Sequence, residues 1–528
     1  MVKTKEGVHM IVEVEYADLI SLLGKSVPLQ DIVNALDMFG TPVDEYDETT
    51  LRVEVFPNRP DMLGPEGISR SLKGVLGIET GLPQWKMSSS ELEIDVTSTT
   101  IRPHLSFATV TGVKLTESAV KSLMQMQEKL HIGMGRNRAK FSIGIYDMDR
   151  IRFPVKYTEM PLKDISFMPL DAPTGEELTG QEVLTQTEKG RDFAHLLPKN
   201  PRKAPVMVDA MDRVISMPPI LNADFCKVTS STTNLLIDST GTAPGTDRMV
   251  ALIATALAER GGTINVVMPG PLFLPGRMKL DMKYIHKLTG LELNRSEVAE
   301  LLKRMRFGFL DEVLIPPYRT DIMNQIDLAE DLAIAYGYQN FTHELPRMGL
   351  VGKPLKVSEF ENTLRCLMVG NGFLEVKLFN LISKVDALLA GGAKVETANP
   401  KSLECSVLRP SLLPGLFGLL RSNKSADYPQ RIFEIGEIFA PGQGRCLAGF
   451  ITHAKAGFTE VKGVVDAIQD LTGKTAEQPT WKAGEHPMFM PGRTAISEWG
   501  VYGELLPVLS QKIGMPVAGF ELRLETDL

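Results

Sequence analysis

The sequence contains few cysteines and no long apolar run. Its four cysteines lie far apart and form no CxxC or Cys/His spacing. This pattern argues against a disulfide framework and against a structural zinc site. No apolar stretch is long enough to span a bilayer, and no basic start precedes an apolar core. The sequence therefore predicts a soluble protein of the reducing cytoplasm that makes no membrane contact.

An excess of positive charge is also absent. Lysine and arginine number 57 against 65 aspartates and glutamates, which gives a formal net charge of -8. A protein that grips nucleic acid by bulk basicity is excluded, because such binding depends on neutralising many phosphates. Any contact with nucleic acid must therefore come from a local basic patch.

Familiar catalytic signatures are missing from the sequence. It has no GxSxG elbow, no phosphate-binding P-loop and no HExxH. His131 and His286 each stand beside helical apolar residues, so we interpret both as packing or surface histidines. Any hydrolysis by this chain must use a positioned water molecule.

The length of 528 residues requires several domains, because a single hydrophobic core stops growing well below that size. Three breaks rich in serine, proline or glycine divide the chain near residues 88–90, 268–276 and 346–354. They predict four modules, which cover residues 10–86, 90–268, 277–343 and 355–528.

The first and third modules repeat one pattern. Each begins with a helical segment that ends in glycine, at Gly24 and at Gly290, and each continues through a second amphipathic helix. Each then reaches the motif Pro-x-Arg-x-Asp, at 57–61 and at 317–321, followed by a helix whose apolar positions coincide at a constant offset. Agreement of motif, helix phase and terminal glycine indicates an internal duplication.

The two copies differ in charge on that last helix. The third module carries Asp327, Glu330 and Asp331 where the first has Gly67, Arg70 and Ser71. Positions i, i+3 and i+4 share a helix face, so these carboxylates and Asp321 can converge on a hard cation such as Mg²⁺. A solvated acidic helix face is the alternative, and spacing alone leaves it open.

A basic, glycine-containing loop at residues 135–140 distinguishes the second module. It follows a helix that ends in Gln127-Glu128-Lys129-Leu130-His131 and leads into the strand at 142–147. Glycine allows close backbone approach and arginine forks match phosphate oxygens, so the loop suits a nucleic-acid end that Arg138 would hold. An ordinary charged surface loop is the alternative.

A second stretch of this module can line a pocket. Residues 216–222 are followed by an apolar strand that delivers Asp238 and Thr240 into a glycine turn. Polar side chains at such a strand end can face a ligand. They can equally cap the turn through side-chain hydrogen bonds, and the sequence leaves both interpretations open.

The fourth module mixes helices with strands such as residues 431–439. Its Arg-x-x-Glu at 431–434 and its Pro-Gly-Arg at 491–493 resemble, faintly, motifs of class II aminoacyl-tRNA synthetases. The glycine-rich, arginine-bearing motif that grips ATP is missing. We therefore expect an antiparallel-sheet domain of synthetase type that lacks catalytic motifs and packs against a competent relative.

Taken in order, these motifs resemble the phenylalanine–tRNA ligase beta subunit from end to end. The segments that carry the resemblance are 56–61, 127–131, 135–138, 218–222, 317–321 and 433–437. The sequence is similar to the archaeal and eukaryotic type. The bacterial subunit is longer, with an oligonucleotide-binding insertion and an anticodon-binding domain for which 528 residues leave no room.

The resemblance implies an α+β multidomain protein in which two related helix-rich modules flank an α/β editing domain. It implies a complex of two alpha and two beta subunits that joins phenylalanine to tRNA(Phe). ATP would be bound mainly by alpha, with Mg²⁺ as a further cofactor, and beta would hold no catalytic residue for aminoacylation. Beta would contribute structure and hydrolytic editing of tyrosyl-tRNA.

The resemblance also assigns sites. The magnesium ligands of the family fall on four acidic residues, Asp321, Asp327, Glu330 and Asp331. Its editing pocket maps onto Gln127, Glu128, Arg138, Ser216, Asn222, Asp238 and Thr240, and Met207 corresponds less closely. Met134 and Cys226 fall in segments that do not align with the family pattern.

Editing has a physical reason, because an apolar pocket rejects an added hydroxyl only about a hundredfold. A second site that pairs with the tyrosine hydroxyl, through Glu128, Asn222 or Asp238, would correct the error. One alternative is a free-standing deacylase of mischarged tRNA, which needs no synthetase-like fourth module. Another is a non-enzymatic nucleic-acid-binding scaffold, which the acidic net charge disfavours.

Overall fold

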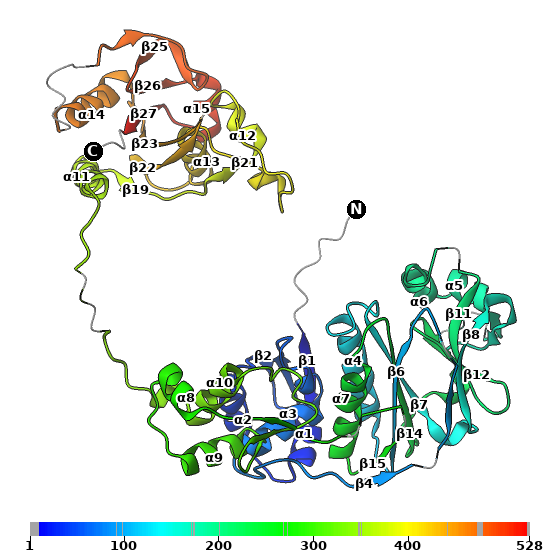
Figure 1. Ribbon diagram of the computed structural model, residues 1–528. Helices are drawn as coiled ribbons and strands as arrows, with labels where there is room; N and C mark the ends of the chain where they lie inside the picture. The colour runs from blue at the N-terminus through cyan, green and yellow to red at the C-terminus, as the bar shows by residue number, and fades with distance from the viewer. Residues whose placement is uncertain are drawn as a thin grey trace. The chain divides into compact units, whose positions relative to one another are not determined.

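The computed structural model describes residues 10–524 apart from 91, 98, 171, 173–174, 200, 268, 272, 347–348, 350, 441 and 472–478. The chain forms two compact units, Met1–Glu344 and Leu345–Leu528. Both combine helices and sheets (Figure 1), so the expectation of a mixed α/β multidomain protein is confirmed.

The first unit begins with a small three-stranded sheet and three helices. The chain runs through β1 (Ile11–Glu15), α1 (Tyr16–Leu23), α2 (Leu29–Met38), β2 (Val43–Tyr46), β3 (Thr50–Glu54), a 3-10 turn (Pro60–Met62) and α3 (Pro65–Val75). The sheet order is β1-β3-β2, and both strand pairs are antiparallel. Helix α1 ends at Gly24, whose φ of 69° is one that glycine adopts without steric cost.

The same order of elements returns at the end of this unit. It comprises β16 (Gly276–Met278), α8 (Met282–Thr289), α9 (Arg295–Arg304), β17 (Gly308–Phe309), β18 (Val313–Ile315) and α10 (Gln325–Tyr336). The sheet order is β16-β18-β17, and α8 ends at Gly290 with a φ of 75°. The strand that opens each copy was not foreseen, because β1 and β16 are only 5 and 3 residues long.

Equivalent side chains make equivalent contacts in the two copies. Arg59 forms a two-point ion pair with Asp61, with N···O distances of 2.9 and 2.8 Å. Arg319 does the same with Asp321, at 2.9 and 2.7 Å. The guanidinium carbons of Arg59 and Arg319 also lie 4.8 and 4.9 Å from the ring centres of Phe39 and Phe307. The duplication therefore extends to the contacts of single side chains.

Between the copies lies a layered structure of two five-stranded sheets. One has the order β4 (Met87–Ser89), β15 (Thr263–Val266), β6 (His104–Thr111), β14 (Leu235–Gly241), β7 (Phe141–Asp147). The other has the order β13 (Leu221–Asn222), β12 (Val214–Met217), β11 (Lys203–Val208), β8 (Val155–Pro161), β5 (Ile94–Val96). Helices α4 (Glu117–Ile132) and α7 (Thr246–Glu259) cover the face of the first sheet that is turned away from the second (Figure 1).

Strand alternation assigns the side chains of β14 to two cores. Ile237 packs toward α4 and α7, whereas Leu236 packs toward the second sheet. The strand is buried on both faces, and its apolar residues 235–237 are followed by a buried polar stretch, residues 238–240. Asp238 and Thr240 point to the side of Leu236, between the two sheets.

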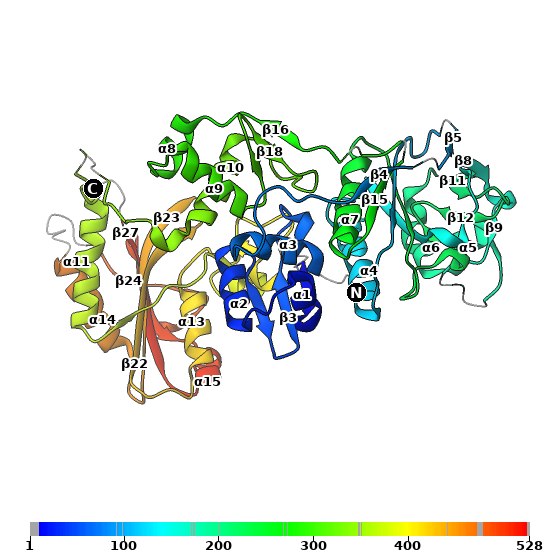
Figure 2. The same cartoon turned by 90° about the horizontal axis from the view of Figure 1, so that it is seen from below.

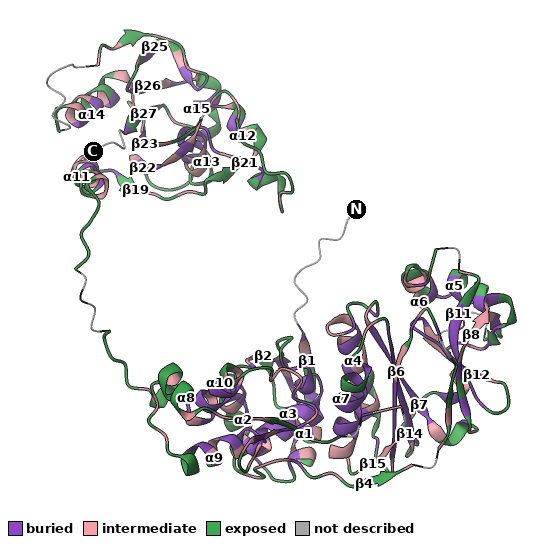
Figure 3. Ribbon diagram, viewed as in Figure 1, coloured by how far each residue is buried: buried purple, intermediate pink, exposed green. Residues whose placement is uncertain are grey.

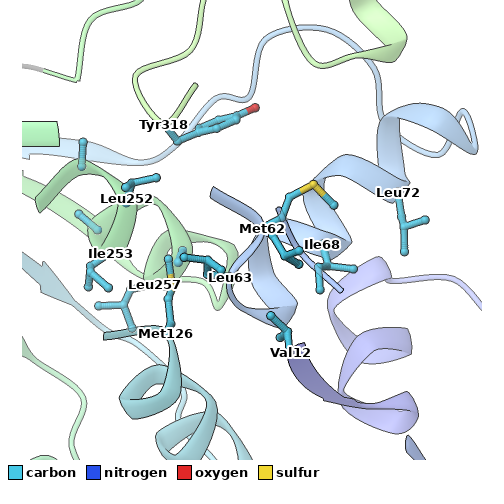
Figure 4. Close-up of a cluster of buried hydrophobic side chains, with 14 of the residues drawn as sticks. Val12, Met62, Leu63, Ile68, Leu72, Met126, Leu252, Ile253, Leu257 and Tyr318 are labelled. Atoms are coloured by element: carbon cyan, nitrogen blue, oxygen red, sulfur yellow. The ribbon is translucent and has the colours of Figure 1, made fainter. Parts of the chain in front are cut away.

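One hydrophobic core joins the repeated copies to this layered part. Figure 4 shows Met62 and Ile68 of the first copy, Met126 of α4 and Leu257 of α7 in one cluster, together with Tyr318 of the second copy. Ten residues of α7 are buried, which Figure 3 shows as a helix coloured largely as buried. The first three predicted modules thus share a core within one compact unit, and the module boundaries remain predictions.

The second unit is built on a seven-stranded sheet of order β19-β22-β23-β27-β26-β25-β24, antiparallel except for the first pair. The strands are β19 (Leu374–Glu375), β22 (Gln430–Phe439), β23 (Gln443–Thr452), β24 (Lys482–Ala483), β25 (Phe489–Ser497), β26 (Gly500–Leu505) and β27 (Val517–Leu524). A separate pair, β20 (Leu381–Ile382) and β21 (Val407–Leu408), lies beside α12 (Lys384–Leu388).

Two helices pack on each face of the large sheet. In Figure 2, α11 (Lys356–Gly370) and α14 (Phe458–Leu471) lie on one side, and α13 (Leu413–Ser422) and α15 (Pro507–Ile513) on the other. Glu434 of the predicted Arg-x-x-Glu is fully buried and pairs with Arg409 at 2.9 Å, while Arg431 pairs with Glu460. The expected antiparallel sheet is therefore present, and both members of the Arg-x-x-Glu have partners within the fold.

Candidate functional site

A cavity of about 230 Å³ opens between the two sheets of the first unit. An apolar cavity of about 150 Å³ holds a benzene molecule, so this volume accommodates an aromatic side chain. Four of the predicted site residues line it, Gln127, Arg138, Asn222 and Asp238. The other lining residues are His131, Ser142, Ile143, Gly144, Tyr146, Leu170, Lys189, Pro218, Pro219, Ile220 and Leu221.

Asp238 is a buried ionisable group of this cavity, with 1% of its surface exposed. The Tyr146 hydroxyl donates to Asp238 Oδ1 at 2.7 Å, and Ser216 Oγ lies 3.1 Å from the same hydroxyl. Burial raises the pKa of Asp238 to about 6, and it raises the pKa of Tyr146 well above its ordinary value. Ser216 thus belongs to the site through Tyr146 and does not line the cavity itself.

Gly144 makes room for this pair. It faces Asp238 across the β7–β14 ladder, and a Cβ at this position would overlap both Tyr146 Oη and Asp238 Oδ1. Ser142, Gly144 and Tyr146 alternate along β7 and therefore share its cavity face. The sequence signal for these three residues is their alternation with the apolar Phe141, Ile143 and Ile145. They were not among the predicted site residues.

Arg138 is a wall of the cavity, with 8% of its surface exposed. Its Nη2 donates to Glu128 Oε2 at 2.9 Å, and its Nη1 donates to the carbonyl oxygen of Ile220 at 3.0 Å. Its guanidinium carbon lies 4.5 Å from the ring centre of Phe193. Arg138 thus links Glu128 of α4 to the 218–222 segment, and the expectation that it holds a nucleic-acid end stays a prediction.

The turn that carries Arg138 has an uncommon backbone. Arg136, Asn137 and Arg138 have φ values of 51°, 52° and 65°. Left-handed conformations cost free energy in non-glycine residues, so contacts with the surrounding structure must stabilise this turn. Arg136 and Asn137 are exposed, and Lys140 is half-buried. The cations of this loop that solvent can reach are therefore Arg136 and Lys140.

His131 is part of the cavity wall, so its interpretation as a packing or surface histidine was incomplete. It is 3% exposed, and its Nε2 accepts from the Ile143 N–H at 2.8 Å. The other ring nitrogen, Nδ1, lies 3.3 Å from Glu128 Oε2 and donates to it. This hydrogen bond, helped by Arg138, lowers the pKa of Glu128, whereas burial lowers the pKa of His131.

The remaining predicted residues lie beside the cavity. Glu128 is bound to Arg138 and His131, and Thr240 Oγ1 lies 2.9 Å from Ser142 Oγ behind the cavity lining. Met207 is fully buried in the second sheet. Cys226 is buried, and its burial raises the pKa of the thiol to about 12. His286 is half-exposed near Glu292, as expected of a surface histidine.

The four predicted magnesium ligands line one cleft of about 620 Å³. Asp321 and Asp331 both contact Arg319, the latter at 2.6 Å. Asp327 Oδ2 accepts from the backbone N–H groups of Met323 and Asn324, at 2.7 Å each, and so caps α10. Over the described ranges, no three or more His, Cys, Asp or Glu side chains are arranged to hold a metal ion.

The first copy shows what Asp331 does. Ser71 occupies the equivalent position there, and its Oγ accepts from Arg59 Nη2 at 3.3 Å. Asp331 therefore supplies a second acceptor to Arg319, as Ser71 does to Arg59. Four carboxylates suit Mg²⁺ in chemistry, but three of them are engaged by the protein itself. As arranged, these residues do not fit a magnesium ion.

Relatives of known family were found for almost the whole chain. The phenylalanine–tRNA ligase beta subunit of Methanothrix thermoacetophila is 37% identical, over 97% of this chain and 99% of the relative. That of Archaeoglobus fulgidus is 36% identical, over 93% of this chain and 94% of the relative. The chain belongs to the phenylalanine–tRNA ligase beta subunit family.

Two family models and one solved structure agree with this membership. The tRNA synthetase B5 domain matches residues 278–338, and the phenylalanyl tRNA synthetase beta chain CLM domain matches residues 342–524. The crystal structure of an N-terminal fragment of the phenylalanyl-tRNA synthetase beta subunit from Pyrococcus horikoshii has 34% identity and a TM-score of 0.58. It covers 62% of this chain and 99% of the fragment.

Membership makes the chain a ligase subunit of the aminoacyl-tRNA synthetases, as the resemblance predicted. Among the helices that the structure describes, none is long and apolar enough to cross a membrane.

Proposed function

We propose that the cavity between the two sheets hydrolyses tyrosyl-tRNA, within an assembly of two alpha and two beta subunits. In this assembly alpha joins phenylalanine to tRNA(Phe) with ATP, which alpha mainly binds, and Mg²⁺. We assign editing to the region 90–268, scaffolding to 10–86, 277–343 and 355–528, and the whole complex to the cytoplasm. The observation that carries the proposal is the buried carboxyl of Asp238 facing a cavity of aromatic size.

The chemistry follows from the residues that line the cavity. Asp238 and Asn222 offer polar groups to a phenol hydroxyl, and phenylalanine would leave them unpaired at a cost of about 1 to 3 kcal/mol. Glu128 is less suited to this task, because His131 and Arg138 already hold its carboxylate. Discrimination therefore rests on Asp238 and Asn222.

Hydrolysis itself requires an oriented water. The water oxygen attacks the ester carbonyl, the bond to the terminal ribose oxygen breaks, and that oxygen receives a proton. The products are free tyrosine and uncharged tRNA. Asp238 is ionised above about pH 6, so at neutral pH it can accept a hydrogen bond from the water or from the phenol. No described residue of the cavity is a nucleophile activated by an adjacent base.

The decisive experiment measures deacylation of preformed tyrosyl-tRNA and phenylalanyl-tRNA by the reconstituted alpha–beta complex. We expect faster release of tyrosine than of phenylalanine, and Asp238→Ala should abolish the difference. Equal rates for the two substrates, or an unchanged rate in Asp238→Ala, would place editing elsewhere. The chain without alpha, tested in parallel, separates this proposal from a free-standing deacylase, whose rate would not depend on alpha.

A further inference from the structure

A buried arginine lies behind the cavity. Arg102 precedes β6, has 1% of its surface exposed, and has no described carboxylate within ion-pair distance. Burying a cation without an ionic partner is costly. Burial lowers the pKa of Arg102 to about 10, so the guanidinium remains charged at neutral pH.

The guanidinium joins three parts of the site. Its Nε donates to Thr240 Oγ1 at 3.0 Å, and its Nη2 donates to the Thr240 carbonyl oxygen at 2.7 Å. Nη2 also lies 3.3 Å from Ser142 Oγ, and Nη1 donates to the Arg138 carbonyl oxygen at 3.2 Å. The end of β14, the start of β7 and the left-handed turn at 136–138 are therefore fastened to one side chain.

Arg102 is in turn held in place from behind. Its own carbonyl oxygen accepts from the Tyr157 hydroxyl at 3.2 Å and from Thr99 Oγ1 at 3.0 Å. Tyr157 belongs to β8 of the second sheet and Thr240 to β14 of the first, so Arg102 is hydrogen-bonded to both sheets. A planar guanidinium can satisfy this fork of acceptors, whereas a lysine cannot.

We infer that Arg102 is a positioning residue for the hydrolysis of tyrosyl-tRNA, one that holds Asp238 and Arg138 in place and faces Asp238 with a positive charge. Asp238 and Thr240 are two residues apart on β14 and so share a face, which brings the guanidinium near the carboxyl. The inference rests on the proposed function. It adds a residue that touches no substrate and acts through its neighbours.

The charge has a measurable consequence for Asp238. The positive charge of Arg102 favours the ionised carboxylate and opposes the effect of burial. The other titratable and charged groups around this carboxyl are Tyr146, Tyr157, His131, Arg138 and Lys189. Removing the arginine charge should therefore raise the pKa of Asp238 further, so that a rate which depends on ionised Asp238 falls off at a higher pH.

Two substitutions separate the charge from the hydrogen-bonding fork. Arg102→Gln removes the charge, and Arg102→Lys keeps it but loses the fork. In the reconstituted complex, we expect both to lower kcat for tyrosyl-tRNA by about ten- to a hundredfold. Only Arg102→Gln should shift the acid limb of the pH–rate profile upward. KM for tyrosyl-tRNA should change little, because Arg102 does not contact the substrate.

Matched variants keep the test decisive. Thr240→Val removes one acceptor while leaving the charge, so it should lower kcat without moving the acid limb, and it serves if Arg102→Gln fails to fold. Lys227→Gln, which removes an exposed ammonium paired with Asp224 in the same layered part, should behave as wild type. The inference is overturned if Arg102→Gln keeps the wild-type kcat and pH profile. It is also overturned if Thr240→Val keeps the wild-type kcat or shifts the acid limb. A wild-type complex that shows no preference for tyrosyl-tRNA would instead overturn the proposed function.

Discussion

At the scale of single residues, the site combines groups whose environment works against them. Asp238 is a carboxyl enclosed between two sheets, and Arg138 is an arginine turned inward in a left-handed turn. Strain and desolvation of this kind are costly to a fold and are concentrated at functional sites. Substituting Asp238 or Arg138 should therefore change stability and editing separately, which an experiment can measure.

Replacing Asp238 by asparagine should stabilise the protein while it abolishes editing. The folded-state pKa of about 6 lies above the ordinary 3.8, so this group contributes most to stability below pH 3.8 and loses that contribution as the pH rises through 6. At neutral pH the ionised carboxyl costs on the order of 2 to 3 kcal/mol, which asparagine avoids. Thermal melts at about pH 7.5 measure the gain in stability, and deacylation assays measure the loss of editing.

The control for that substitution is Tyr146→Phe, which removes the donor and leaves the carboxyl without its partner. It should destabilise the protein where Asp238→Asn stabilises it. A melting temperature of Asp238→Asn below that of wild type at neutral pH would contradict the desolvation argument.

Arg138→Ala should slow deacylation of tyrosyl-tRNA by about ten- to a hundredfold, since a charge-assisted contact contributes about 1.5 to 3 kcal/mol. Because both of its Nη groups bind the protein, we expect the loss in kcat and little change in KM. The exposed Arg136 serves as the matched variant, and Arg136→Ala should affect KM alone if it contacts tRNA. A rise in KM with unchanged kcat for Arg138→Ala would instead support a direct contact of Arg138 with tRNA. Aminoacylation should hardly change in either variant.

At the scale of elements, the duplicated unit shows how one framework accepts different charges. Helix α3 is buried almost throughout because α1, α2, α7 and α9 all pack on it. Its counterpart α10 leaves Ile326 and Glu330 exposed. The arginine of Pro-x-Arg-x-Asp keeps the same contacts in both copies, and the residue that completes its bonding is a serine in one and an aspartate in the other.

Asp331→Ala should destabilise the protein by about 1.5 to 3 kcal/mol, because Arg319 loses one charged acceptor and keeps its pair with Asp321. Asp331→Ser, which copies the first repeat, should be milder. Thermal melts with and without Mg²⁺ check both. If the carboxylates serve the fold, Mg²⁺ will change the melting temperature of the double variant Asp327→Ala, Glu330→Ala as it changes that of wild type. A change seen in wild type and lost in the variant would support a metal site there.

At the scale of the whole molecule, the two compact units predict separable folding. Residues 10–344 should fold alone, as the fragment from Pyrococcus horikoshii indicates for a relative. Residues 90–268 alone should not, because α7 and α4 would lose the shared core with the repeated copies. Cooperative melts and amide exchange of both fragments provide the measurement, and a cooperative, well-protected 90–268 fragment would contradict the shared core.

The purified chain without alpha should not form phenylalanyl-adenylate. Its second unit lacks a recognisable ATP-gripping motif, and Glu434 and Arg431 are paired within the fold. Phenylalanine-dependent exchange of pyrophosphate into ATP is the test. Exchange by beta alone, in a preparation shown to be free of alpha, would refute this expectation.

The sequence by itself determined the family, the duplication and the elements that carry Asp238 and Arg138, because these depend on local motifs, helix phase and strand alternation. Only the tertiary structure decided which side chains contact one another. It placed Arg102 behind the cavity and Ser142 in its lining, turned Arg138 inward and paired Asp331 with Arg319. Contacts between residues far apart in the chain, such as the 138 positions between Arg102 and Thr240, leave no periodic signal in the sequence. Burial and charge pairing arise only when the sheets close on one another.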